Sequence, residues 1–419
     1  MHNHTRALFT LFFTIFLDMV GVGILIPIIP ILFADPVSPH YLLPAGTSVQ
    51  TGYVYLGIML ALFSLGQFIA APIIGQLSDR YGRKKLLIIS IIGTVIGQAL
   101  FAVGIFFKIL PLLFFVRLFT GITTGNVVIA QASVADLTTP ENRAKNFGLI
   151  GAAFGLGFVV GPFIGGRLAD PTLISWFNAA TPFMFASLLS LLNLLFVVKM
   201  FRETNQHIKK VERIKWGKSL HNITHAFNAK KLRPVFLTSF LFQMGFSFYT
   251  TFASVFLFYR FGFTESSIGN YFAYVGLWIV FSQAVVTRLV SKKFSEVVII
   301  QNSLVIVGLM ILGIFLSPES TWIYVIVPFF AMAIGLSQAN ITSLLSRSAG
   351  PAMQGEVLGI NGSLNALAMT LPPLISGFIA ATFEPSAPLA ISAFIVIASG
   401  LYFNNHIRRN KNLVSVQLQ

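Results

Sequence analysis

The sequence contains no cysteine and few charged residues. The absence of cysteine excludes disulfides and thiolate metal sites. Only 10% of the 419 residues are Asp, Glu, Lys or Arg, whereas a soluble domain carries about 25%. All seven histidines fall in predicted tails or loops, which leaves the apolar segments without a Ser–His–acid set or a metal-binding cluster. This composition argues against a soluble enzyme.

Long apolar runs dominate the chain. Hydrophobic residues make up 55% of it, with 43 Phe and 34 Gly. A helix needs about 20 apolar residues to cross a bilayer, and membrane β-strands would instead alternate over about 10 residues. The first run lacks a small-residue cleavage site and predicts a retained helix rather than a signal peptide. The predicted fold is an all-α membrane protein with twelve transmembrane helices, at 7–33, 52–76, 86–107, 110–134, 145–168, 176–200, 234–259, 267–290, 295–316, 321–343, 356–382 and 385–405.

The basic residues predict the orientation of these helices. With both termini in the cytoplasm, 24 of the 28 Lys and Arg residues lie on cytoplasmic connections, helix ends or tails. Lys108, Arg167 and Arg260 fall outside, and Arg117 lies within a helix. This arrangement obeys the positive-inside rule, so the net charge of +15 does not require a nucleic-acid partner. We expect a multi-pass protein of the cytoplasmic (inner) membrane.

One connection is longer than the others and divides the helices into two groups of six. It predicts a bundle over 1–200, a basic cytoplasmic linker over 201–233 and a second bundle over 234–419. The linker is expected to lie on the anionic inner leaflet; a specific ligand role is the alternative.

The second half repeats the first at an offset of 211 residues. Five Gly and Pro positions then coincide: Pro140 with Pro351, Gly148 with Gly359, Gly151 with Gly362, Pro162 with Pro373, and Gly166 with Gly377. Duplicated membrane halves are typical of secondary transporters. We therefore expect two pseudo-symmetric six-helix bundles.

The segment GQLSDRYGRKK, between the second and third helices, resembles the signature of the major facilitator superfamily, G-x-x-x-D-R-x-G-R-K. The matching residues are Gly75, Asp79, Arg80, Gly82, Arg83 and Lys84. Gly75 permits close helix approach, Gly82 a tight turn, and Asp79 can accept hydrogen bonds from Arg83. The resemblance implies a cytoplasmic latch that stabilises the outward-open state, with Asp136 as a third partner. The matching region of the second half, TRLVSKKFSE, lacks the pattern, so a one-sided latch is expected.

The fifth helix resembles a second pattern of the superfamily, G-x-x-x-G-P-x-x-G-G, which marks proton-driven exporters more than importers. The matching residues are Gly157, Gly161, Pro162, Gly165 and Gly166. A kinked, closely packed helix is the plainer interpretation, and it is compatible with the first.

The first helix carries LDMVGVGILIPIIP, which resembles that of tetracycline–proton antiporters and related drug exporters. Asp18 lies about 16 Å into this helix and is the only carboxylate well inside any span. An acid at that depth is costly and can carry a proton; neutralisation by a neighbouring helix is the alternative. In the fourth helix, Arg117 and Gly121 resemble the superfamily's R-x-x-x-G motif, with Thr120 in place of a common Gln. Arg117 is expected to tune the Asp18 charge, or else to bind backbone carbonyls.

The resemblance also implies a central cavity lined by helices 1, 4, 7 and 10. Besides Asp18 and Arg117, the residues expected there are Asn126, Gln131, Gln243, Phe246, Tyr249, Gln338 and Asn340, with Asn361 and Asn365 from helix 11 and Asn270, Tyr274 and Trp278 from helix 8. Aromatic walls with a few polar groups suit amphipathic molecules. Tetracycline pumps carry further acids in helices 3 and 9, and their absence here argues against metal–tetracycline recognition.

Together these features predict a proton-coupled exporter of small amphipathic compounds. A proton-coupled importer of a polar nutrient is the alternative, and a membrane enzyme or sensor a remote one. The expected partners are a small-molecule substrate, protons and the lipid bilayer. We expect a monomer without metal or cofactor, driven by the proton gradient.

Overall fold

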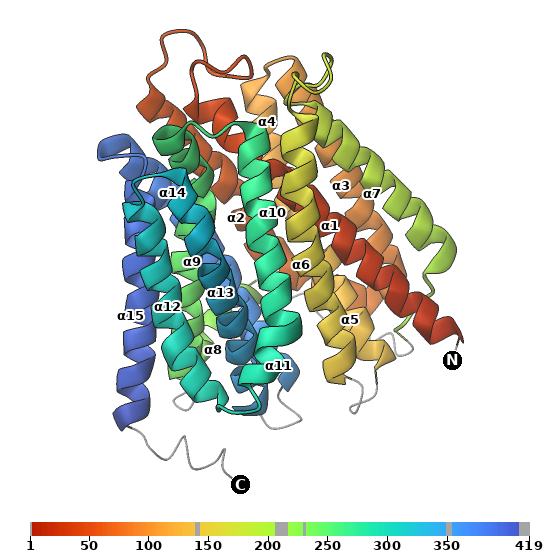
Figure 1. Cartoon of the computed structure of the whole chain (residues 1–419). Coiled ribbons are helices and arrows are strands. Elements are labelled where there is room, and N and C mark those ends of the chain that lie inside the picture. The colour runs from red at the N-terminus through yellow and green to blue at the C-terminus, as the bar shows by residue number, and fades with distance from the viewer. Residues whose placement is uncertain (1, 139–142, 206–216, 229–231, 349–353, 410–419) are drawn as a thin grey trace. The chain divides into compact units, whose positions relative to one another are not determined.

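The computed structural model describes residues 2–138, 143–205, 217–228, 232–348 and 354–409. Its helices are drawn in Figure 1 and contain twelve spans long and apolar enough to cross a membrane. The twelve predicted helices are therefore confirmed. The elements are α1 (His2–Ala34), α2 (Val49–Tyr81), α3 (Arg83–Phe106), α4 (Leu110–Thr123), α5 (Asn126–Leu137), α6 (Arg143–Leu168), α7 (Thr181–Met200), α8 (Lys218–Asn228), α9 (Arg233–Phe261), α10 (Glu265–Phe281), η2 (Ser282–Val286), α11 (Thr287–Val290), α12 (Glu296–Leu316), α13 (Ser320–Ser348), α14 (Gln354–Thr382) and α15 (Ala387–Arg409).

The helices belong to two compact units. Unit 1 comprises Met1–Lys218 and Phe263–Ala273, and unit 2 comprises Ser219–Gly262 and Tyr274–Gln419. The start of α10 thus clusters with unit 1, although it follows the first helix of the second half. The segment 201–233 includes a short helix, α8, in which Ala226 is buried and Asn222 donates to Ser363 Oγ of α14 at 3.0 Å. The middle of that segment, 206–216, lies outside the described residues.

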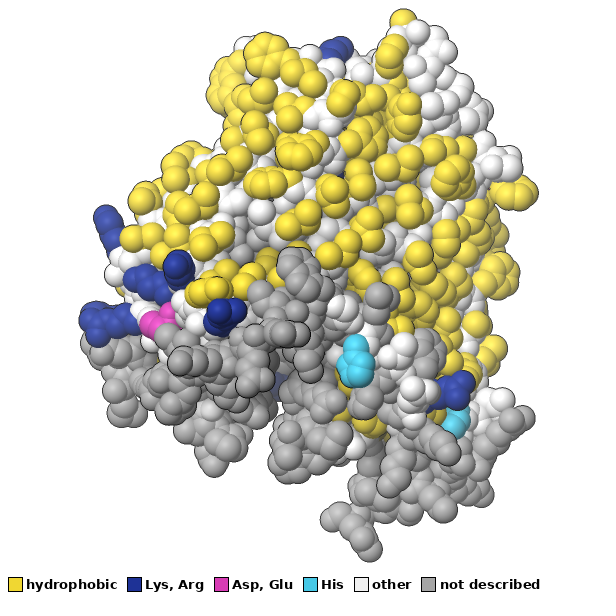
Figure 2. Space-filling view, turned by 180° about the vertical axis from the view of Figure 1, so that it is seen from behind, with side chains coloured by type: hydrophobic (Ala, Val, Ile, Leu, Met, Phe, Trp, Pro, Cys, Tyr) yellow, Lys and Arg dark blue, Asp and Glu magenta, His cyan; other side chains and the backbone are white. Residues whose placement is uncertain are grey.

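Hydrophobic side chains cover much of the described surface in Figure 2, and most of the visible Lys and Arg side chains gather at the left of the view, beside the grey region. Large apolar side chains such as Phe115, Phe378 and Phe394 are more than half exposed. In water such a surface would aggregate. Facing lipid, it is what a membrane-spanning bundle requires.

Three spans differ in detail from the sequence prediction. The helix predicted at 176–200 begins at Thr181, and the one predicted at 110–134 is interrupted between α4 and α5. The span 265–290 contains one π-helical turn, η2. There the Ser282 hydroxyl donates to the Met332 carbonyl of α13 at 2.8 Å, and Gly335 leaves room for it. Ser282 and Gly335 thus bring α13 close to this span at the π-helical turn.

The small residues of α6 form the packing surface for α1. A Cβ on Gly157 would lie 2.3 Å from Met19 Cβ. A Cβ on Gly161 would lie 2.7 Å from the Val20 carbonyl oxygen, and a Cβ on Gly165 would lie 2.5 Å from the Ile24 carbonyl oxygen. A Cβ on Gly166 would instead meet the Glu265 carbonyl oxygen of α10 at 2.4 Å. The glycines of the helix-5 motif therefore allow backbone contacts on both sides of α6.

These contacts predict that Gly161→Ala destabilises unit 1. The new methyl group would be forced against backbone atoms of α1, an overpacking that costs about 1–3 kcal/mol. Thermal unfolding in detergent should show a lower Tm for this variant.

Gly151→Ala is the matched control because it lies on the same helix and has no neighbouring atom within 4 Å of a built Cβ. Its Tm should equal or exceed that of the wild type, since Ala is the better helix former. Equal Tm values for the two variants would contradict the packing argument.

Candidate functional site

Asp18 lies in the interior of α1 with an unsatisfied carboxylate oxygen. Its side chain is 7% exposed, and Oδ2 has no hydrogen-bond partner within the described part of the chain. The Asn126 side chain approaches this carboxyl, but neither Asn126 Oδ1 nor Nδ2 completes a hydrogen bond among the described residues. A buried polar group left unpaired costs about 1–3 kcal/mol. Two such groups side by side mark a place where a proton or ligand would be stabilising.

A break in the fourth span brings Asn126 to this position. The helix stops at Thr123 and restarts at Asn126. The Thr120 carbonyl accepts from Thr124 N at 2.9 Å and from Thr124 Oγ1 at 2.6 Å. Gly125 lies between the two helices, where a larger residue would clash, because a Cβ there would lie 2.4 Å from Ile74 Cγ2. The Thr120 carbonyl at the end of α4 is therefore fully hydrogen-bonded, as backbone groups inside a membrane must be.

Arg117 is buried, and it forms no ion pair with Asp18 in this structure. Its Nε donates to the Met59 carbonyl of α2 at 3.5 Å. Its guanidinium lies 4.7 Å from the Phe63 ring centroid and 6.0 Å from that of Phe101. The alternative of backbone binding is therefore observed, while an influence of Arg117 on the Asp18 charge stays a prediction. Gly121 makes this packing possible, since a Cβ there would be 2.2 Å from the Phe63 carbonyl oxygen.

Sequence reasoning missed two further polar side chains near Asp18. Thr14 lies one turn before it on α1 and donates to Asn193 Oδ1 of α7 at 3.0 Å. Gln98 of α3 reaches Gly21, with its Nε2 3.8 Å from a built Cβ. The spacing of four residues between Thr14 and Asp18 was an available signal, since such residues share a helix face.

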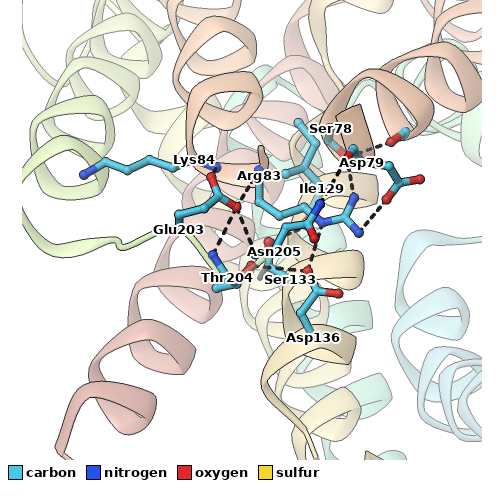
Figure 3. Close-up of polar contacts among 11 residues, drawn as sticks. Ser78, Asp79, Arg83, Lys84, Ile129, Ser133, Asp136, Glu203, Thr204 and Asn205 are labelled. Atoms are coloured by element: carbon cyan, nitrogen blue, oxygen red, sulfur yellow. Dashed lines mark hydrogen bonds and ion pairs between the residues drawn. The ribbon is translucent and has the colours of Figure 1, made fainter. Parts of the chain in front are cut away.

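A second polar centre forms around Arg83, at the ends of α2, α3 and α5 (Figure 3). Arg83 NH2 lies 2.6 Å from Asp79 Oδ1, and its Nε lies 3.0 Å from Asp136 Oδ2. Its NH1 donates to Ser78 Oγ at 2.6 Å. The structure thus brings the predicted Arg83, Asp79 and Asp136 together; with Ser78 they form the Arg83 network.

The signature segment is mostly helical rather than an extended connection. Gly75, Asp79 and Arg80 lie on α2, Arg83 begins α3, and only Gly82 stands between the two helices. Gly82 has a φ of 95°, a conformation that favours glycine. The predicted tight turn is therefore observed.

Three residues after α7 complete the network and were not predicted. The Glu203 carboxylate accepts from the backbone N–H of Arg83 at 2.8 Å and of Lys84 at 3.0 Å. Thr204 Oγ1 donates to Asp136 Oδ2 at 3.3 Å, and Asn205 Nδ2 donates to the Asp79 carbonyl at 2.9 Å. Glu203 is 120 residues from its partners, so no local pattern could have identified it.

The remaining signature residues lie beside the Arg83 network. Arg80 is exposed, with its guanidinium 5.2 Å from the Tyr81 ring centroid. Lys84 Nζ donates to the Val198 carbonyl near the end of α7 at 3.0 Å. A Cβ on Gly75 would lie 3.4 Å from Val128 Cγ1 of α5, consistent with a close helix approach.

The predicted cavity residues outside α1 and α4 occupy varied environments. Tyr249 of α9 is 1% exposed, with its ring centroid 4.8 Å from that of Phe330 and 6.1 Å from that of Phe246. Asn340 is buried and donates to its own helix at Leu336, and Asn365 accepts from Ser239. Asn361 is buried, and its Oδ1 is unpaired among the described residues. Three of the predicted residues are half-buried, namely Gln243, Gln338 and Trp278, and two are exposed, namely Gln131 and Asn270. Tyr274 donates to the Tyr324 carbonyl. Their role in substrate binding stays a prediction.

Comparison with known proteins gives consistent results. The family model "Major Facilitator Superfamily" matches residues 11–373. The chain is 31% identical to the class H tetracycline resistance protein of Pasteurella multocida, over 87% of this chain and 86% of that protein. It is 26% identical to multidrug resistance protein 1 of Bacillus subtilis, over 90% and 91% of the two chains. A solved bacterial homolog of the human lysosomal transporter Spinster has a TM-score of 0.76 at 15% identity, covering 97% of each chain.

The contacts of Glu203 predict that Glu203→Ala loosens the start of α3. The variant removes the acceptor for two backbone N–H groups, and loss of such a cap costs about 0.5–2 kcal/mol. Hydrogen exchange in a peptide that covers residues 80–90 should accelerate. Glu319→Ala, at an exposed acid before α13, is the control and should leave that peptide unchanged. Unaltered exchange in the Glu203 variant would show that the carboxylate does not hold the helix end.

Proposed function

Because the chain belongs to the major facilitator superfamily of transporters, we propose that it exports small amphipathic compounds in exchange for protons. Alternating access of the two halves would carry substrate out as a proton enters. The energy source is then the proton gradient, with no cofactor. The transporter works as a monomer, with both termini in the cytoplasm, as the distribution of basic residues favours.

The unpaired oxygen of Asp18 carries this proposal. A charged carboxylate is costly inside an apolar span, and no residue in the described part of the chain donates a hydrogen bond to Asp18 Oδ2. The proton binds at the carboxyl when Asp18 is open to the outside. It leaves when the carboxylate is stabilised, by solvent or by substrate, on the inside.

Asn126 is suited to accompany both forms of Asp18. An amide has two N–H donors and a carbonyl acceptor. Its Nδ2 would donate to the ionised carboxylate, and its Oδ1 would accept from the protonated acid. Since both atoms are buried and unpaired in the described part of the chain, a small movement of α5 against α1 would let either bond form.

The Arg83 network supplies the conformational control. It ties the end of α2 to the start of α3 and the end of α5, three helices of unit 1. We place it on the cytoplasmic side, where it stabilises the state closed to the cytoplasm. Arg83 is buried, but the Asp79 and Asp136 side chains are 47% and 26% exposed, so each ion pair contributes about 1 kcal/mol, enough to bias a two-state equilibrium by about fivefold.

Several features favour export of an amphipathic compound. The relatives are tetracycline and multidrug resistance proteins, and the α6 motif resembles that of exporters. The proposed cavity carries aromatic residues and uncharged amides but no charged side chain from unit 2. An importer of a polar nutrient would be expected to carry more charge there, so that alternative is not favoured.

We predict that Asp18→Asn abolishes proton-coupled transport, because an amide side chain cannot take up and release a proton at physiological pH. Proteoliposomes with an internal pH-sensitive dye would be challenged with lipophilic cations, antibiotics and small metabolites. A compound that triggers proton flux with the wild type should give only the background of protein-free liposomes with the variant.

Glu319→Gln is the control for loss of an acid elsewhere, and it should transport normally. Full pH-gradient-driven activity in the Asp18 variant would remove this residue from the mechanism. Proton flux triggered only by sugars or carboxylates would contradict export and would favour a proton-coupled importer of a polar nutrient.

We also predict that Asn126→Leu slows coupled transport by about tenfold, as expected for loss of a hydrogen bond to a charged group. Asn302→Leu is the control because it changes an exposed amide that lies outside the proposed cavity and outside the Arg83 network. Equal rates in these two variants would mean that Asn126 does not assist Asp18.

A further inference from the structure

Unit 2 has a polar cluster where the start of α12 meets the end of α13. Glu296, the first residue of α12, accepts from Ser343 Oγ at 2.5 Å and from Arg347 Nε at 3.3 Å. The Glu296 side chain is 13% exposed, whereas that of Arg347 is 74% exposed. The second carboxylate oxygen, Oε2, is buried without a hydrogen-bond partner among the described residues. Glu296, Ser343 and Arg347 are called the Glu296 cluster below.

This cluster occupies the position of the Arg83 network in the internal repeat. The offset of 211 residues places Arg347 on Asp136, because 347 − 211 = 136. The same offset brings Glu296 to position 85, two residues after Arg83. In both units the N-terminus of the third span is thus tied to the C-terminal end of the fourth. The signs are inverted, with the cation on the third span in unit 1 and the anion on it in unit 2.

The inverted charges explain why unit 2 lacks the superfamily signature but still has an ion pair between its third and fourth spans. The signature requires an Arg at the start of the third span, and unit 2 has Glu296 there. The expectation of a one-sided latch was drawn from the missing pattern, and a missing pattern does not exclude a charged contact at this place. An ion pair is present in each unit.

Helix dipoles make the two arrangements physically different. The N-terminus of a helix favours an anion and the C-terminus a cation. Glu296 and Arg347 obey this preference in the first turn of α12 and the last turn of α13. Arg83 and Asp136 oppose it, and Glu203 supplies the missing negative charge at the start of α3. The Arg83 network depends on a third acid, and the Glu296 cluster does not.

We propose that Glu296, Ser343 and Arg347 form a charge-inverted second latch that holds the end of α13 in register with α12 during transport. Asn340, Ser343 and Arg347 follow at spacings of three and four residues and share one stripe of α13. Fixing Ser343 and Arg347 therefore also positions Asn340, one of the proposed cavity residues. These are positioning residues, and their role in turnover rests on the proposed transport function.

The burial of Glu296 predicts an unusual order among variants. Arg347→Gln leaves a buried carboxylate without its cation, which is the costly change. Glu296→Gln leaves an exposed Arg that water can solvate, so its effect should be up to about fivefold. The double variant Glu296→Gln/Arg347→Gln should recover most of the loss seen in Arg347→Gln, and Arg347→Lys should stay near wild type because it keeps the charge.

The experiment measures substrate-triggered proton flux and hydrogen exchange on the same preparations. Turnover at saturating substrate should fall about tenfold in Arg347→Gln, with a smaller change in KM through Asn340, if the latch acts mainly on cycling. Exchange in peptides covering 296–302 and 337–348 should be fastest in that variant and return toward wild type in the double variant. Glu319→Gln, at the other end of α13, is the control.

Two results would overturn the proposal. One is an Arg347→Gln variant that matches Glu319→Gln in flux and exchange. The other is a double variant worse than Arg347→Gln, because two independent sites would add their effects. If no compound produces flux even with the wild type, the transport function fails, but the exchange order still tests the cluster on its own.

Discussion

The high cost of a charged side chain in hydrocarbon shapes this molecule. Translocon-based scales put it at about 2.5–3.5 kcal/mol at the centre of a helix, and the charged side chains of the described residues accordingly lie mostly at helix ends or in connections. Among these described residues, Asp18 and Arg117 are the exceptions. Arg117 keeps its charge at any physiological pH and is accordingly surrounded by a carbonyl and two rings. Asp18 can lose its charge by taking up a proton, and it is the one left with an unpaired oxygen.

The same constraint applies to the backbone and explains where the helices are interrupted. In lipid, a helix can stop only where other groups satisfy its free N–H and C=O. At the break between α4 and α5, the Thr120 carbonyl accepts from both the backbone N–H and the hydroxyl of Thr124. At the π-helical turn, the Ser282 hydroxyl donates to the Met332 carbonyl of α13. The first interruption places Asn126 beside Asp18. The irregular backbone and the unpaired acid are therefore parts of one arrangement, built from residues with short hydroxyl side chains.

The sequence was sufficient for features that depend on one segment or on a fixed spacing. Apolar length predicted the twelve spans, and the signature spacing predicted that Arg83 would meet Asp79. It was insufficient where a contact depends on distant residues of ordinary type. Glu203 looks like any loop acid until the turn at Gly82 presents two N–H groups to it. The break in the fourth span, at Thr123, Thr124 and Gly125, was predicted as continuous helix, because each of these residues is tolerated within a helix. Tyr249 was predicted in a cavity from its helix alone, and its packing against Phe330 was not foreseeable.

Duplication gave the two halves similar frameworks with different polar chemistry. The third spans start with opposite charges, at Arg83 and Glu296, and the fourth span is broken in unit 1 but continuous as α13 in unit 2. Both charges buried in mid-span belong to unit 1, whereas the interior of unit 2 offers aromatic rings and uncharged amides such as Tyr249 and Asn340. Inside the span, a proton can change the charge only at a titratable side chain, and Asp18 is the carboxyl that the described residues place in mid-span. In the proposed mechanism unit 1 therefore binds the proton, and unit 2 contributes shape, apolar contact and hydrogen bonds. This division follows from which half retained a charge that can be neutralised, and it does not require the two halves to differ in fold.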